Sequence, residues 1–94
     1  MGHGPRNWGF DEAERKLLTK ATMDLPELRA VIDRAVLRPD LAAGLHLVRA
    51  TFTELDEMYS LVEVLKSQAR SERRLDVLDG LLASLCSSLD SDLM

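Results

Sequence analysis

The clearest pattern in the chain is an apolar repeat that runs from Asp40 to Ala69. Its members are spaced alternately four and three residues apart, and Lys66 alone interrupts them. This is the a/d spacing of a coiled coil, sustained over about four heptads. It predicts one long helix over 40–69, with Gly44 inside it. The apolar seam consists of Leu41, Leu45, Val48, Phe52, Leu55, Tyr59, Val62 and Ala69.

Two shorter helices are predicted before this stretch. Asp11 and Glu14 have the spacing of a capping box, which places the first helix over about 11–22. Asp24 and Glu27 repeat that spacing, with Pro26 in the first turn of the second helix, where its missing N–H costs nothing. These two helices are expected to form a hairpin that ends before Pro39.

A further helix is predicted from about residue 72 to residue 89, with leucines at positions 75, 78, 82, 85 and 89. The segment 67–74 allows two interpretations, because it contains neither glycine nor proline. The long helix could continue through it, or the chain could turn near Arg70 with Ser71 as the next N-cap. The apolar repeat loses phase here, which favours the turn and a helical hairpin.

The expected fold class is therefore all-α: a small helical bundle with two short helices, a long helix and a C-terminal helix packed in a coiled-coil-like manner. Residues 1–10 are expected to form an irregular leader, 11–90 a single domain and 91–94 a frayed tail. The composition agrees, since 46% of residues are hydrophobic but only 4% are aromatic, as is typical of helical bundles. No segment alternates with period two, so no sheet is expected.

The apolar stripe of the long helix is wider than a two-stranded seam, and the C-terminal helix is too short to cover its first third. A second copy of the chain could cover that part. Small helical chains often need such a partner, and twofold dimers are the commonest oligomers. The seam from Leu41 to Val62 therefore predicts a homodimer interface.

The formal net charge of −4 argues against a general nucleic-acid binder. Cys86 is the only cysteine, which fits a reducing compartment. No apolar run reaches the roughly 20 residues that span a bilayer, and the first residues lack the apolar core of a signal peptide. We therefore expect a cytoplasmic protein without a membrane partner.

No catalytic or cofactor-binding motif stands out. The chain has no glycine-rich phosphate loop, no Cys-x-x-Cys and no nucleophile with a base nearby. An enzyme is therefore not expected, nor is a cofactor. His46, Glu54 and Glu57 could contribute to a metal or small-molecule site only if another helix or a second copy supplied further ligands.

Two further features are candidate contact sites for a partner. Lys66, Arg70, Arg73 and Arg74 form the strongest concentration of positive charge, which could bind phosphate or an acidic peptide. Trp8 and Phe10 could either fold back onto the helices or serve as a docking hook.

The first functional hypothesis is a non-enzymatic protein–protein interaction or assembly module. The alternative is a small nucleic-acid-binding regulator that uses the Lys66/Arg70/Arg73/Arg74 basic group. The third is a metal- or small-molecule-binding helical bundle. A helix-turn-helix formed by the first two helices is less favoured, because the second helix carries charges of both signs.

Overall fold

The computed structural model describes residues 5–38, 40 and 44–90. In these residues it contains four helices and a three-stranded antiparallel sheet. The prediction of a purely all-α bundle is therefore wrong, although most of the described residues are helical. The strands lie in the stretch expected to be an irregular leader, at the end of the second predicted helix and in the first part of the long predicted helix.

The sheet has the strand order β1–β3–β2, and both pairings are antiparallel. β1 spans Arg6–Phe10, β2 spans Val36–Arg38 and β3 spans Leu45–Ala50. β3 is the central strand. It lies beside β1, in a register that pairs Trp8 with Val48, and beside β2, where Leu37 pairs with His46.

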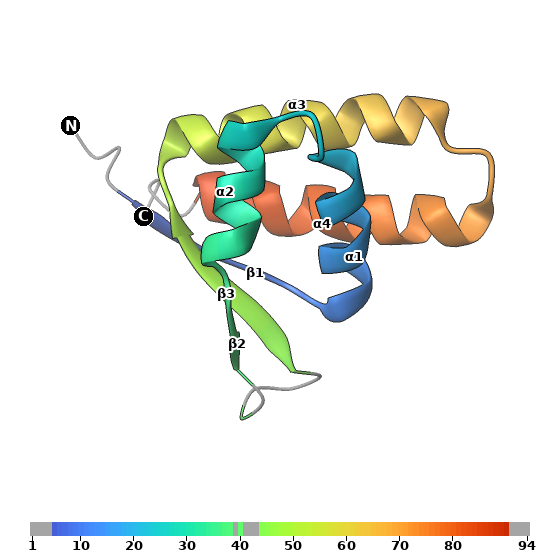
Figure 1. Cartoon of the computed structure of the whole chain (residues 1–94). Coiled ribbons are helices and arrows are strands. Elements are labelled where there is room, and N and C mark those ends of the chain that lie inside the picture. Colours follow the sequence, from blue (N-terminus) through green and yellow to red (C-terminus); the bar gives the residue numbers. More distant parts are fainter. Residues whose placement is uncertain (1–4, 39, 41–43, 91–94) are drawn as a thin grey trace.

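The helices are α1 (Glu12–Ala21), α2 (Pro26–Arg34), α3 (Phe52–Gln68) and α4 (Glu72–Asp90). α3 and α4 form a long hairpin, and α1 and α2 lie together beside it (Figure 1). α4 also packs along β1, so the hairpin and the sheet form one body.

The core lies between one face of the sheet and the helices. Trp8, Phe10, Val48 and Ala50 point inward from the strands and are almost completely buried. They meet buried residues of all four helices, namely Leu18, Leu28, Val31, Ile32, Leu55, Met58, Val62, Leu78, Leu81 and Leu85. The Trp8 indole N–H donates a hydrogen bond of 3.0 Å to Ser84 Oγ, which ties β1 to α4.

The long helix predicted over 40–69 is wrong in its first part. The φ angle of Gly44 is positive, a left-handed conformation that a helix interior does not contain. β3 follows it, and α3 begins only after Thr51. The Thr51 hydroxyl accepts from the backbone N–H of Glu54, and the Glu54 carboxylate accepts from the backbone N–H of Thr51. This capping box fixes the start of α3.

The observed helix ends decide the other local predictions. The capping box of Asp11 and Glu14 is confirmed. The one predicted at Asp24 is wrong, because α2 begins at Pro26 with Leu25 as its N-cap and no side-chain cap. The turn between the two long helices is confirmed, with α4 beginning after Ser71. Positions 91–94, predicted to fray, lie outside the described residues.

Candidate functional site

One face of α1 carries lysines over an apolar base. Leu18 is fully buried and sets the inward side of this helix. Ala13, Lys16, Leu17 and Lys20 follow one another at helical spacing and therefore share a neighbouring face. Both lysines are exposed, and Leu17 is half-buried against the core.

The start of α4 faces this side of α1. The Ser71 hydroxyl accepts a hydrogen bond of 3.1 Å from the backbone N–H of Arg74, so that Ser71 caps the helix. Arg73 and Arg74 then lie in the first turn. They are exposed, whereas Val77, one turn later, is half-buried against the core.

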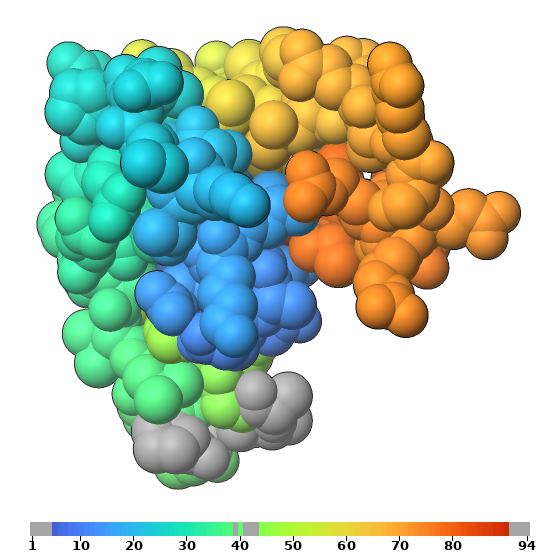
Figure 2. Space-filling model, turned by 45° about the vertical axis from the view of Figure 1, so that its right-hand side comes forward, coloured from blue at the N-terminus to red at the C-terminus, as the bar shows by residue number. Residues whose placement is uncertain are grey.

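These two helix faces line a hollow of about 370 Å³. Figure 2 shows the surface recessed between α1, in blue, and the start of α4, in orange. A smaller hollow of about 130 Å³ shares Leu17, Lys20 and Arg74 with it and reaches Leu65 of α3 and Leu78. We call the two together the basic groove. Its cationic residues are Lys16, Lys20, Arg73 and Arg74, and its apolar base contains Leu17, Leu65 and Val77.

A separate hollow of about 320 Å³ opens on the other side of the two lysines. It is lined by Arg15, Lys16, Thr19, Lys20, Met23 and Arg29. Met23 is 70% exposed. Lys16 and Lys20 therefore form a ridge with a hollow on each side, and each hollow is also lined by arginines.

Within the described ranges of the chain, the cationic residues of the basic groove lack the ion pairs that several other lysines and arginines form. Elsewhere, Arg15 binds Glu12 at 2.7 Å, Arg29 binds Asp33 at 3.3 Å, and Lys66 binds Asp79 at 2.7 Å. Among the described residues, Lys16, Lys20, Arg73 and Arg74 form no ion pair with an acidic side chain. Their charge is therefore not compensated by a direct contact inside this part of the chain.

The structure divides the basic group that the sequence pattern singles out. Arg73 and Arg74 lie in the groove. Lys66 is paired with Asp79, and the bond to this carboxylate raises the pKa of Lys66. Arg70 is exposed in the turn between α3 and α4 and does not line the groove. The lysines of α1 complete the site instead.

The sequence pattern does not predict Lys16 and Lys20 as site residues, because the apolar stripe that defines the first predicted helix does not include them. A signal was present, since two lysines four residues apart flank Leu17 on one helix face. That α1 packs beside the start of α4 could not be derived from this spacing, because it depends on the sheet that places α1.

The sequence leaves open whether Trp8 and Phe10 form a docking hook or fold back onto the helices. The structure places both side chains in the core, 1% and 0% exposed, with their ring centroids 4.7 Å apart. They hold β1 against α4 and are not accessible on the surface.

The predicted interface residues that the structure buries belong to the core of the chain itself. Val48, Leu55 and Val62 are in this group. These three side chains are therefore not exposed to a second copy in the folded monomer.

The other predicted interface residues are less buried. Phe52 and Tyr59 are half-buried, and the Arg6 guanidinium carbon lies 5.0 Å from the Phe52 ring centroid. Leu45 lies half-exposed on β3, and Leu41 lies outside the described residues. The seam thus does not form one continuous exposed stripe over the residues that the structure describes.

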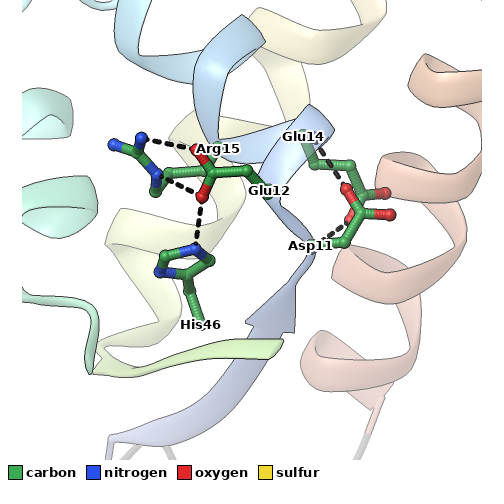
Figure 3. A network of polar contacts seen from close by, with 5 residues as sticks. All are labelled: Asp11, Glu12, Glu14, Arg15 and His46. Atoms are coloured by element: carbon green, nitrogen blue, oxygen red, sulfur yellow. Dashed lines mark hydrogen bonds and ion pairs between the residues drawn. The ribbon is translucent and has the colours of Figure 1, made fainter. Parts of the chain in front are cut away.

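His46 belongs to a polar network between β3 and the start of α1 (Figure 3). Its Nε2 lies 2.8 Å from a carboxylate oxygen of Glu12, and this carboxylate also accepts two hydrogen bonds from Arg15. These bonds lower the pKa of Glu12 to about 2, and the hydrogen bond from Arg15 makes the largest contribution. The imidazole is almost buried and stacks on Phe10, with 5.8 Å between ring centroids. The network links α1 to β3.

No cluster suitable for a metal ion occurs among the described residues. His46 and Glu54 are engaged elsewhere, since Glu54 caps α3 and binds Arg34 at 3.1 Å. Glu57 is exposed and lines a hollow with Glu27 of α2. The surface where α2 borders α3 is therefore acidic. A recognition helix of a helix-turn-helix would instead present basic or polar residues to DNA.

No protein-family model, curated protein or solved structure matches the chain. In the part of the chain that the structure describes, no helix has the length and apolar character needed to cross a membrane.

Proposed function

We propose that the protein is a non-enzymatic interaction module that binds a protein partner through the basic groove. The observation that carries this proposal is the combination of four cationic side chains without ion-pair partners among the described residues and an apolar base, contributed mainly by two helices. Charged rims give specificity and speed association, and the buried centre of an interface is its more apolar part.

A nucleic-acid-binding regulator is the competing proposal, because unpaired Lys and Arg side chains also bind phosphate. One observation favours a protein partner. A phosphate backbone would leave Leu17, Leu65 and Val77 without apolar contacts.

Self-association is a further proposal, since the sequence pattern predicts a homodimer. Part of the seam on which that prediction is based is used inside one chain. Exposed apolar residues that could support self-association include Val36 and Leu37 of the edge strand β2, Val64 of α3, and Met23 and Leu25 between α1 and α2. Light scattering of the wild type over a range of concentrations measures whether it occurs.

The proposal is tested by capturing partners with matched variants. Lys20→Gln with Arg74→Gln removes two charges from the groove, whereas Arg49→Gln with Arg70→Gln removes two exposed charges outside it. Each immobilised protein is incubated with a cell extract, either untreated or digested with nuclease, and the bound proteins are identified by mass spectrometry. Circular dichroism first checks that both variants are folded.

We expect a small set of proteins that wild type and the control variant retain from the digested extract and the groove variant loses. If all three retain the same proteins, the groove is not the binding surface. If groove-dependent capture occurs only in the untreated extract, the nucleic-acid alternative replaces the proposal.

A further inference from the structure

The shape, charge and apolar base of the basic groove restrict the kind of polypeptide segment that can bind there. From these three properties we infer that the partner contributes an acidic amphipathic helix that lies along α1 and the start of α4. This inference rests on the proposed function and specifies the partner's chemistry.

The first argument is the shape of the walls. The α1 wall is a single helix face that runs from Ala13 to Lys20. At a rise of about 1.5 Å per residue this face is about 10 Å long, or roughly two helical turns. Arg73, Arg74 and Val77 form the α4 wall over about one turn. A helix packed into a groove is a recurring mode of peptide recognition.

The second argument is the spacing of the charges. Lys16 and Lys20 are four residues apart on α1. This separation corresponds to a rise of about 6 Å along the helix. Carboxylates four residues apart on a helix packed alongside have the same rise and can therefore meet both lysines. The arginines of α4 lie on the opposite wall and can donate two parallel hydrogen bonds each to a second row of carboxylates.

The third argument is the apolar base between the walls. Leu17 and Val77 are half-buried against the core and retain exposed area in the groove. A helix with an apolar stripe between two acidic rows would cover that area, whereas an acidic chain without a stripe would not. Of two peptides with the same net charge, the groove should therefore bind more tightly the one whose apolar residues form a stripe.

The test uses two synthetic peptides of the same composition. Both consist of Glu, Ala and Leu and are long enough for about five helical turns. In the first, the leucines are spaced i, i+3, i+4 and i+7 to form a stripe, and in the second the same residues are scrambled. Binding is measured by fluorescence anisotropy of labelled peptides. Chemical-shift changes in the amide NMR spectrum locate the site. A duplex DNA of similar charge is the third probe.

We expect the striped peptide to bind at least about tenfold more tightly than the scrambled one, with shifts at Lys16, Leu17, Lys20, Arg74 and Val77. Lys16→Gln with Lys20→Gln should weaken its binding about tenfold, because both rim charges that face the carboxylates are lost. Arg49→Gln with Arg70→Gln, which removes the same charge outside the groove, should leave binding within about twofold.

Equal binding of both peptides would overturn the inference, because binding would then depend on net charge alone. Tighter binding of the DNA than of the striped peptide would also overturn it, because the groove would then favour nucleic acid. Shifts confined to other residues, or no binding of either peptide, would also overturn it. If the wild type self-associates and Lys16→Gln with Lys20→Gln does not, the occupant is a second copy and the inference fails. The proposed function fails separately, because it depends on groove-dependent capture from an extract.

Discussion

At the scale of single residues, Glu12 links two elements of the fold through one carboxylate. It bridges Arg15 on the same helix and His46 on β3, although it is itself exposed. The hydrogen bonds lower its pKa from 4.5 to about 2. As the pH falls, the unfolded chain therefore binds a proton at Glu12 before the folded chain does.

The sign of the resulting pH dependence follows from this difference. A lowered pKa gives stability that is fully present above the unfolded value of 4.5 and is lost as the pH falls toward about 2. Glu12→Gln should therefore be less stable than wild type at pH 6, and the gap should shrink through this window. Urea unfolding at several pH values measures it.

Glu57→Gln serves as the control, because it replaces an exposed carboxylate for which no ion pair is found in the described part of the chain. Its difference from wild type should stay small and nearly constant with pH. A gap for Glu12→Gln that does not change between pH 6 and pH 2 would contradict the role assigned to the network.

At the scale of secondary structure, the segment 44–50 shows why the apolar repeat was misleading. Leu45, Leu47 and Val48 are so close together that a heptad pattern and an alternating pattern can each include some of them. Burial alternates along β3, with His46, Val48 and Ala50 inward, which identifies period two. Long-range pairing with β1 decides between the two patterns, and that pairing is not encoded locally.

Local signals did exist for the true boundaries. Thr51 and Glu54 have the same capping-box spacing that correctly predicted the start of α1. Gly44 before a short apolar run is typical of a loop that precedes a strand. The Thr51/Glu54 spacing alone indicates a third helix that begins at residue 52. The α3–α4 hairpin was predictable because the apolar repeat loses its phase at the same place where Ser71 offers an N-cap.

Gly44 permits a test of the chain just before β3. Its positive φ lies in the left-handed region, where a β-carbon is strained. Gly44→Ala should lower the free energy of unfolding by about 1–2 kcal/mol. A β-carbon there would meet Leu37 at an ordinary distance of 3.8 Å, so the cost should come from the backbone conformation. Urea unfolding of the variant measures it.

Gly44→Asn is the matched variant, because asparagine tolerates the left-handed conformation better than alanine does. It should lose less stability than Gly44→Ala in the same measurement. Equal losses in the two variants would show that the side chain, and not the backbone conformation, is responsible.

At the scale of the whole molecule, tertiary contacts arrange the charge of the groove. The sequence pattern predicts Arg73 and Arg74 as candidate contacts, but not Lys16 and Lys20. The four residues come together because α1 follows β1 and packs beside α4, which itself lies along β1. The sheet therefore determines the candidate site, and a prediction that omits the sheet can find only half of it.

The same dependence on tertiary contacts changes the expectation for the apolar seam. Leu55 is fully buried among residues of its own chain. Leu55→Ala should therefore lower the free energy of unfolding by about 2–5 kcal/mol. Ser60 lies on the same helix but is exposed, so Ser60→Ala is the control. Its free energy of unfolding should differ from that of wild type by no more than about 0.5 kcal/mol.

Thermal unfolding of each variant at two protein concentrations separates folding from assembly. When a folded chain is stabilised by binding a second copy, its melting temperature rises with concentration. If the buried part of the seam serves the monomer, Leu55→Ala should lose stability while the melting temperatures of wild type and variant stay independent of concentration. If the melting temperature rises with concentration in wild type but not in Leu55→Ala, Leu55 is needed for assembly. The seam would then be a dimer interface, and its assignment to the core of the monomer would be wrong.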